Sequence, residues 1–290
     1  MKNSNASFNI TKNRINDAYI YNEIDCLQTI VLNISEYCNL KCKMCPRSNT
    51  DIYPNRKLFM NLKTIRKIRE RLDEINYCGT VSISGNGEPC YNPFIYGIIG
   101  ILTEKYNCKY PKYKIKLLTN GYPDIVYSII SKMGVKILVS VHIIQDLEKI
   151  KEKFKNIDDV VFRNHDPNDP DNELKITNRS GICNKNVSNS DTCYYPLYKM
   201  MIDYDGSYLM CADDWLRKTK NDNYNVFKTS IKDWFCILSS NDRKDKYFKF
   251  KNQLLNNKRK EINELCAKCD CNGLLMGSKM YIFYKEKMNG

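Results

Sequence analysis

Three cysteines lie close together near the beginning of the chain. Cys38, Cys42 and Cys45 fall within SEYCNLKCKMCPRS, directly after an apolar, β-branched run that ends at Ile34. Thiols three or four positions apart on one loop suit a shared metal better than a mutual disulfide. A cubane iron–sulfur cluster normally takes four thiolates, so three thiolates would leave one iron open to a cofactor or substrate. The spacing therefore predicts a catalytic iron–sulfur site.

A zinc site on the same loop would need a further protein ligand. The chain has two histidines, His142 and His165, and neither is near the three cysteines in sequence. We interpret His142 as a partly buried structural histidine rather than a catalytic one. The iron–sulfur interpretation is therefore preferred over zinc at this loop.

A second group of cysteines lies in the last third of the chain. Two of them flank apolar runs that are joined by Asp205–Gly206. This dipeptide is a strong signal for a β-hairpin, which would bring both thiols to one end. The other three form the sequence CAKCDC. The five members are Cys193, Cys211, Cys266, Cys269 and Cys271.

The composition limits the class of protein. The 290-residue sequence contains 14 cysteines, and it has neither a run of about 18 apolar residues nor an apolar stretch at its N-terminus. We therefore expect a cytoplasmic protein with no membrane helix and with reduced cysteines. The scattered cysteines are interpreted as small buried hydrophobic residues. These are Cys26, Cys78, Cys90, Cys108, Cys183 and Cys236.

The net charge is +13, from 46 Lys and Arg against 33 Asp and Glu. The excess is spread along the chain without dense basic blocks, so a nucleic-acid partner is not favoured. A non-enzymatic iron–sulfur or zinc protein that binds nucleic acid remains the alternative from another class. A basic surface also suits phosphorylated metabolites or nucleotide-linked sugars.

Short β-branched runs alternate with amphipathic stretches, which is typical of a parallel sheet wrapped by helices. Helices are expected at 61–76, 92–106 and 123–134, with Gly134 as the C′ cap of the last. The expected strands are Gln28–Ile34, Thr80–Ser84, Lys114–Leu118, Ile137–Val141, Asp159–Arg163 and, as a sixth, Leu174–Thr177.

Five or six β/α units are too few to close an eight-stranded barrel. The expected fold class is α/β, a partial (β/α)6 TIM-type barrel with a small C-terminal cysteine-rich domain. We place an N-terminal arm at 1–25, the barrel at 26–179 and the second domain at 180–290. In such sheets the chemistry lies beyond the carboxyl ends of the strands.

Small polar residues follow four consecutive strands. SGNGEP follows the second strand, and its glycines allow close backbone approach while its carboxylate can accept from a cation. For the arginine at the end of the fifth strand, a salt bridge within a loop is the alternative to a ligand contact. The residues at these strand ends are Gly87, Glu88, Asn120, Ser140 and Arg163.

A strand followed by CNLKCKMCP resembles the defining motif of the radical S-adenosylmethionine (SAM) superfamily. The resemblance implies a [4Fe–4S] cluster held by Cys38, Cys42 and Cys45, whose open iron binds the methionine end of SAM. It also implies that the backbone of Met44 approaches the adenine. The cofactor's ammonium would be bound at Gly87 and Glu88, and further cofactor contacts would come from Asn120, Ser140 and Arg163.

The second cysteine group resembles the auxiliary-cluster domain that many members of this superfamily carry. Twelve residues separate Cys193 from Gly206 and four separate Gly206 from Cys211, and a C-x-x-C follows later. Too few cysteines follow for the long SPASM form, so the resemblance is to the short "twitch" form with one auxiliary [4Fe–4S] cluster. Its implied ligands are Cys193, Cys211, Cys266 and Cys269, and a zinc knuckle of the same residues is the alternative.

The resemblance implies an enzyme that receives an electron from a donor such as flavodoxin or ferredoxin and cleaves SAM reductively. The resulting 5′-deoxyadenosyl radical removes a hydrogen atom from the substrate. Dehydrogenation of a sugar- or cyclitol-like alcohol would use the auxiliary cluster as electron acceptor, with Arg179 as a substrate contact or base. Epimerisation would need a thiol that returns a hydrogen atom, and Cys271 is the candidate.

A ribosomally made peptide is the rival substrate. About 27 residues precede the first expected strand, too few for the leader-binding domain of many peptide-modifying members. We therefore expect a small-molecule substrate.

Overall fold

The computed structural model describes residues 24, 27–105, 110–171, 178–183, 193, 195–237, 259–262 and 264–271. The chain forms two compact units. One comprises 29–174 and 201–231, and the other comprises 1–28, 175–200 and 232–290. Within the described ranges, no helix combines the length and the apolar character that crossing a membrane requires.

A seven-stranded sheet dominates the structure, and its first five strands are parallel. The strand order is β5-β4-β3-β2-β1-β6-β7, so each parallel strand lies beside its neighbour in sequence. This arrangement confirms the predicted α/β class of the partial TIM-barrel type. The parallel strands are β1 (Thr29–Asn33), β2 (Thr80–Ser84), β3 (Lys114–Thr119), β4 (Lys136–Val141) and β5 (Val160–Asn164).

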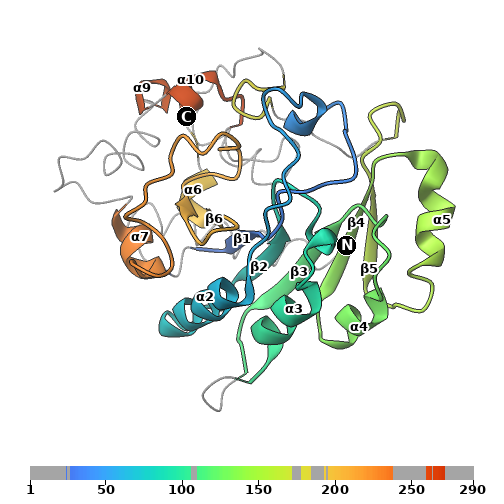
Figure 1. The fold of residues 1–290 in the computed structure, drawn as a ribbon, viewed down its shortest axis with the longest axis horizontal. Helices are drawn as coiled ribbons and strands as arrows, with labels where there is room; N and C mark the ends of the chain where they lie inside the picture. Colours follow the sequence, from blue (N-terminus) through green and yellow to red (C-terminus); the bar gives the residue numbers. More distant parts are fainter. Residues whose placement is uncertain are drawn as a thin grey trace, which may run out of the picture. The chain divides into compact units, whose positions relative to one another are not determined.

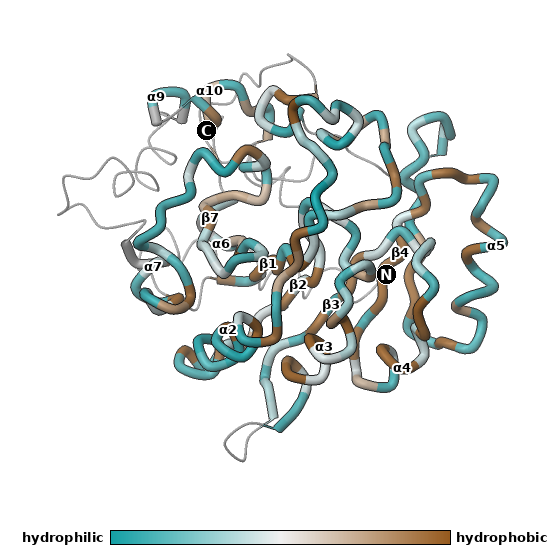
Figure 2. The backbone as a smooth tube through the Cα atoms, viewed as in Figure 1, coloured by the Kyte–Doolittle hydropathy of each residue, from teal (hydrophilic) through white to brown (hydrophobic). Residues whose placement is uncertain are grey.

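Helices that connect the strands cover one face of this sheet (Figure 1). The first begins after Asn61, whose side chain accepts a hydrogen bond from the Thr64 N–H at 2.9 Å and so caps the helix. In Figure 2 the backbone of β1, β2 and β4 is mostly hydrophobic, whereas that of α2 is mostly hydrophilic. The helices are α2 (Leu62–Glu74), α3 (Ile95–Thr103), α4 (Tyr127–Lys132) and α5 (Leu147–Glu152), with 3-10 turns η2 (Pro46–Ser48), η3 (Pro89–Tyr91) and η4 (Ile144–Asp146).

The two faces of the sheet differ in character because side chains alternate along each strand. On the helix side, Ile115 and Leu117 of β3 are buried. On the other side of the same strand, Lys114 is exposed and Lys116 is half-buried. On β3 the helix side therefore faces the core, and the first residues of the opposite face are charged.

The predicted hairpin is present. Strands β6 (Lys199–Ile202) and β7 (Tyr208–Leu209) pair antiparallel, and Gly206 in the turn has a φ of 88°, which favours glycine. Met201 and Leu209 pack on Val31 of β1. Residues 201–231 thus share a compact unit with the parallel strands, and the predicted domain boundaries at 25/26 and 179/180 stay predictions.

All five main strands are found where the sequence predicts them, and the helices are shorter than predicted by a few residues at each end. Gly134 follows α4 with a φ of 78°, as a C′ cap requires. The predicted sixth strand, Leu174–Thr177, lies outside the described residues.

The second unit is described in short pieces. A turn at 178–181 binds the cysteine-rich segment, because the Asn178 N–H donates to Asp270 Oδ1 at 2.7 Å and the Asp270 N–H donates to Asn178 Oδ1 at 3.1 Å. The Asn178 side chain also donates to the carbonyl of Lys268 at 2.7 Å. The described helices here are α6 (Tyr195–Tyr198), α7 (Ile231–Ile237), which begins at the unit boundary, α9 (Arg259–Ile262) and α10 (Glu264–Lys268).

Candidate functional site

The loop that follows β1, residues 35–48 and here called the cysteine loop, carries the first three cysteines. The Cys45 N–H donates to the carbonyl of Cys42 at 2.9 Å, and the Ser48 N–H donates to the carbonyl of Cys45 at 2.9 Å. Pro46 begins η2 directly after Cys45, where its missing N–H costs nothing. These local bonds fold the chain so that all three thiols belong to one compact loop.

The thiols of this loop influence one another. Burial raises the pKa of Cys38 to about 11, a hydrogen bond from the Leu40 N–H opposes the rise, and the charges of Glu88 and Cys45 add to it. Burial raises the pKa of Cys42 to about 12, and the charges of Cys45 and Cys38 raise it further. Three thiolates so placed would repel each other, and a cationic metal centre would stabilise them.

Two asparagines hold Cys38 in position. Asn55 accepts the Cys38 N–H at 3.0 Å and donates to the Cys38 carbonyl at 2.8 Å. Asn120, at the end of β3, donates to Asn39 Oδ1 at 2.8 Å and approaches Cys38 Sγ at 3.9 Å. The predicted cofactor residue Asn120 therefore lies against the cysteine loop.

The loop after β2, residues 85–88 and here called the glycine loop, packs directly on the cysteine loop. A Cβ added to Gly87 would lie 2.7 Å from the carbonyl oxygen of Tyr37 and closer still to that of Ser35. The Glu88 N–H donates to the Tyr37 carbonyl at 2.8 Å. Gly85 has a φ of 125° and packs on Asn33 in the same way. The glycines therefore allow close backbone approach, as predicted, and the segment that they approach is the cysteine loop itself.

The Glu88 carboxylate joins the ends of β2 and β3. It accepts the Asn120 N–H at 2.7 Å, the Thr119 hydroxyl at 2.8 Å and the Cys90 N–H at 3.0 Å. Burial raises the pKa of Glu88, and these donors oppose the rise. The residue is 3% exposed, so its carboxylate has three partners within the chain. Binding of the cofactor's ammonium by Glu88 stays a prediction.

A buried ionic group lies beside the two loops, centred on Arg217. Its guanidinium contacts Glu36 Oε1 at 2.6 Å and Asp203 Oδ2 at 2.5 Å, and both carboxylates are fully buried. Asn33 donates to Glu36 and to Asp203, each at 2.7 Å. Although burial disfavours the charged form, the contacts with Asp203 and Glu36 raise the pKa of Arg217 above its ordinary value. The arginine therefore stays protonated, and together with Arg47, which lies 3.7 Å from Glu36 Oε2, it balances the charge of the two carboxylates.

A second arginine connects this group to the cysteine loop. Arg47 follows the third cysteine by two positions and donates through Nε to the carbonyl of Asn86 at 2.5 Å and through NH1 to Asn55 at 3.1 Å. Tyr53 donates to Glu36 at 2.5 Å and accepts from Arg217 at 3.0 Å. Asn86 donates to the Tyr53 hydroxyl at 3.2 Å, so one continuous set of polar contacts runs from Arg217 to Cys38.

The other predicted cofactor residues lie elsewhere along the strand ends. Ser140 of β4 and Arg163 of β5 are register partners and both are half-buried. Met44 is buried inside the cysteine loop at 7% exposure. His142 lies beside His165 with ring centroids 5.8 Å apart, and burial lowers its pKa. Cofactor contact stays a prediction for Met44, Ser140 and Arg163, and so does the structural role of His142.

The remaining candidate residues belong partly to the second unit. Arg179 lies in the turn at 178–181 with a φ of 49°, and this turn binds the segment that contains Cys266, Cys269 and Cys271. Cys211 belongs to the first unit. Across the described ranges, no three His, Cys, Asp or Glu side chains converge tightly enough to hold a single metal ion. A cubane cluster makes no such demand, because each thiolate binds a different iron.

The sequence analysis missed the residues behind the cysteine loop. Arg47 directly follows the CNLKCKMCP motif and Asn86 lies within SGNGEP. A polar residue next to a proposed cluster or cofactor ligand was the signal that could have identified them. Asp203 and Arg217 carry no local signal, since they meet Glu36 only through the fold. Among the scattered cysteines, Cys90 is buried as expected, whereas Cys78 is exposed.

A partial parallel barrel with three thiols on the loop after its first strand is the architecture of a cluster-binding, cofactor-binding enzyme. The sequence profile of the radical SAM superfamily matches residues 32–183. The chain belongs to this superfamily. No curated protein matches the sequence.

Solved structures support the fold. The crystal structure of BtrN in complex with AdoMet and 2-DOIA has a TM-score of 0.65 and 21% identity, covering 84% of this chain and 93% of that one. BtrN in an open conformation has a TM-score of 0.58 and 19% identity, covering 84% and 92%. SuiB from Streptococcus suis bound to S-adenosylmethionine has a TM-score of 0.46 and 14% identity, covering 77% and 69%. The two BtrN similarities, whose TM-scores are above 0.5, are the ones that support the fold.

The three thiols of the cysteine loop fit the [4Fe–4S] cluster that the radical SAM superfamily binds. The donor set is three thiols on one loop, each partly accessible, which leaves a cluster one iron without a protein ligand. The Leu40 N–H points at Cys38 Sγ at 3.5 Å, and such donors stabilise thiolate ligands. The site is thus suited to a [4Fe–4S] cluster with SAM.

Proposed function

We propose that the chain is a radical SAM dehydrogenase that oxidises an alcohol of a sugar- or cyclitol-like small molecule. When bound, a [4Fe–4S] cluster with SAM supplies a 5′-deoxyadenosyl radical that removes a substrate hydrogen atom. Cys38, Cys42 and Cys45 are the proposed cluster ligands. The observation that supports this most is the joining of the cysteine loop, the glycine loop and Asn120 into one group at the carboxyl ends of β1, β2 and β3.

The chain's own residues position the reactants. Asn55 and Asn120 fix the peptide and the surroundings of Cys38, so the three thiols keep their spacing. The Glu88 carboxylate holds the carboxyl ends of β2 and β3 together. Ser140 and Arg163 are the proposed contacts for the polar ends of SAM, since they lie at the next two strand ends.

Oxidation of a secondary alcohol to a ketone removes one hydrogen atom, one proton and one electron. The hydrogen atom goes to the radical, and Arg179 is the proposed contact for the alcohol oxygen or the base that takes the alcohol proton. Cys193, Cys211, Cys266 and Cys269 would hold an auxiliary [4Fe–4S] cluster, which would supply the acceptor for that electron. The contact between the turn at 178–181 and the segment 268–270 supports a place for Arg179 near that cluster.

Anaerobic reconstitution tests the proposal. We expect about eight irons per chain for two cubane clusters, and 5′-deoxyadenosine from SAM after reduction. Cys38→Ala, Cys42→Ala and Cys45→Ala combined should remove about half of the iron and abolish cleavage. Cys78→Ala, at an exposed cysteine, is the matched control and should change neither quantity. Bound zinc together with no SAM cleavage would contradict the proposal.

The outcome of the reaction needs its own measurement. Incubation with a panel of cyclitols and sugars should give a ketone and reduced iron, without deuterium at carbon when the reaction runs in D2O. Deuterium at an inverted carbon would instead identify an epimerase, with Cys271 as the hydrogen donor to test by Cys271→Ala.

A further inference from the structure

Arg47 is a buried arginine of the cysteine loop. Its side chain is 2% exposed, and it lies in η2, two positions after Cys45. Burying a guanidinium away from water costs free energy unless anions lie close to it. The contacts of Arg47 therefore show which groups its charge acts on.

The hydrogen bonds of Arg47 go to neutral acceptors. Its Nε donates to the Asn86 carbonyl at 2.5 Å, and its NH1 donates to Asn55 Oδ1 at 3.1 Å. Its guanidinium carbon lies 4.9 Å from the centroid of the Tyr53 ring. Its NH2 lies 3.7 Å from Glu36 Oε2, which is too far for a hydrogen bond. Within the described part of the chain, this buried NH2 has no hydrogen-bond partner.

Glu36 is bonded more closely to other groups. Its Oε1 accepts from Asn33 at 2.7 Å and contacts Arg217 at 2.6 Å, and its Oε2 accepts from Tyr53 at 2.5 Å. The pair with Arg47 is longer than each of these contacts. The charge of Arg47 is therefore matched only loosely by Glu36, and a further anion beside it would be stabilised.

Cys38 is connected to Arg47 in two ways. The first is by contact, because Asn55 accepts from Arg47 and holds both the N–H and the carbonyl of Cys38. The second is by charge. Burial raises the pKa of Cys38 to about 11, and the positive charge of Arg47 is among the effects that oppose this rise. The arginine therefore acts on the thiol itself as well as on its peptide.

We propose that Arg47 is a positioning residue that orients Cys38 through Asn55 and whose buried charge raises the reduction potential of the cluster on the cysteine loop. The inference rests on the proposed function, in which three thiolates of this loop hold a [4Fe–4S] cluster. Reduction adds one electron to such a cluster and so one negative charge, which a fixed cation nearby stabilises. Net charge and hydrogen bonds around a cluster are known to set its potential.

A redox titration of the reconstituted full-length protein, followed by electron paramagnetic resonance, tests the proposal. The signal that is missing when Cys38, Cys42 and Cys45 are all replaced with Ala belongs to this cluster. Arg47→Gln removes the charge and keeps a donor. At a fixed solution potential its ratio of reduced to oxidised cluster should fall by about tenfold, which is a shift of about 59 mV to more negative potential.

Arg47→Lys separates the charge from the hydrogen bonds. It keeps the cation and should keep the midpoint potential. A lysine cannot reproduce the fork of an arginine, so this variant should lose iron to a chelator about tenfold faster than the unchanged protein. A potential that falls in Arg47→Lys as far as in Arg47→Gln would overturn the assignment of the shift to charge.

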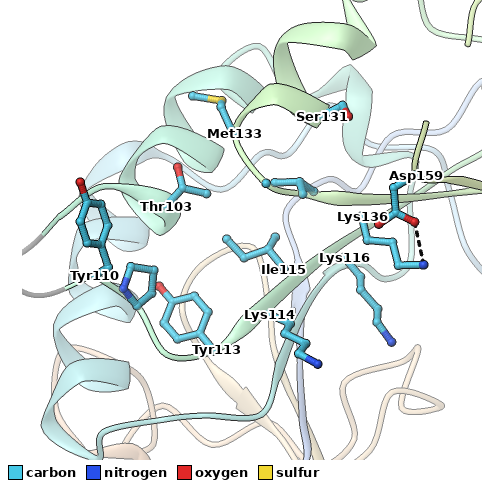
Figure 3. A pocket seen from close by; sticks show the side chains of 13 residues that line it. Thr103, Tyr110, Tyr113, Lys114, Ile115, Lys116, Ser131, Met133, Lys136 and Asp159 are labelled. Carbon is cyan, nitrogen blue, oxygen red and sulfur yellow. Dashed lines mark hydrogen bonds and ion pairs between the residues drawn. The ribbon is translucent and has the colours of Figure 1, made fainter. Parts of the chain in front are cut away.

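Two other cations serve as matched controls. Arg69 is equally buried, at 2% exposure, but its Nε pairs with Asp73 at 2.9 Å within α2. Lys136 at the amino end of β4 pairs with Asp159 at 2.8 Å (Figure 3). Arg69→Gln and Lys136→Gln should leave the midpoint potential unchanged. An equal shift in either control would overturn the proposal by showing an effect of net charge or of general destabilisation.

The unchanged protein provides a second measurement, which keeps the test valid if Arg47→Gln fails to fold. Salt screens a buried charge little, so the midpoint potential should stay constant from about 0.05 M to 0.5 M salt. A strong salt dependence would overturn the proposal by showing that exposed charges set the potential. An unshifted potential in Arg47→Gln with normal SAM cleavage would overturn it and leave the proposed function standing. A shifted potential without SAM cleavage by the unchanged protein would support the role of Arg47 and contradict the proposed function alone.

Discussion

The side chain of Asn55 forms hydrogen bonds with both sides of the Cys38 peptide, accepting its N–H at 3.0 Å and donating to its carbonyl at 2.8 Å. Asn55 lies 17 residues after Cys38 and is itself exposed, so it contributes little to the core. Its position beside a proposed cluster ligand indicates that it fixes the direction of that thiol.

Replacing Asn55 with Ala is expected to weaken cluster retention with little effect on folding. Residues that orient metal ligands typically change metal affinity by about 10- to 100-fold when mutated. The rate of iron loss to a chelator, followed by visible absorbance, measures this. Asn221→Ala removes a comparable turn hydrogen bond, to the Asn223 N–H, that does not involve the cysteine loop, and it should leave the rate unchanged. Equal rates in all three proteins would show that Asn55 has no orienting role.

Replacing Arg217 with Met should destabilise the protein by about 3–5 kcal/mol, because buried Asp203 loses its counter-charge and buried Glu36 keeps only Arg47, at 3.7 Å. Urea unfolding of the metal-free protein measures the change. Lys220→Met is the control, since Lys220 pairs with Asp205 at a more exposed position and should cost less than about 1 kcal/mol. Adding Asp203→Asn to Arg217→Met should recover part of the loss. A loss below that of Lys220→Met would contradict the assignment.

Gly87→Ala is expected to displace the cysteine loop, because the added Cβ would overlap the carbonyl oxygens of Ser35 and Tyr37. We expect a lower iron content and a lower unfolding temperature. Gly100→Ala is the control, because its nearest atom would be 3.8 Å away and alanine favours the helix by about 1 kcal/mol. A Gly87→Ala protein with normal iron content and normal stability would show that the two loops are not in contact.

His142 predicts a pH dependence of stability. Burial lowers its pKa below the ordinary value of 6.5. Between the lowered pKa and 6.5 the unfolded chain binds more protons, so the free energy of unfolding falls as the pH falls through this window. Urea unfolding from about pH 7.5 to pH 5 should show a steeper fall for the unchanged protein than for His142→Gln. Parallel curves for the two proteins would contradict the prediction.

The positions of the parallel strands could be predicted from the sequence. Short β-branched runs such as TVSIS that alternate with amphipathic helices are typical of parallel strands and of few other structures. The sequence was also sufficient to identify Cys38, Cys42 and Cys45 as a group, because their spacing is local. The helix ends at Glu74 and Thr103 were overestimated, since apolar periodicity continues beyond the last helical hydrogen bond.

The partners of Glu88 and Arg217 could not be predicted in the same way. Glu88 suggests a ligand contact by its motif, yet its donors Thr119 and Asn120 are 31 and 32 residues away and are brought there by strand pairing. Arg217 meets Glu36 across an even longer separation, so only the folded chain shows the ion group. Long-range polar contacts leave no periodic trace in a sequence.

The hydrogen bond between Asn33 and Asp203 joins residues that are 170 positions apart. During synthesis at 5–20 residues per second, roughly 10 to 30 seconds separate the appearance of these two residues. Until the later residue and Arg217 emerge from the ribosome, the nascent barrel carries Glu36 with Arg47 as its one cationic partner among the described residues. Iron delivered to a partly made chain would therefore meet an unfinished loop, and cluster insertion is expected to follow release of the completed protein.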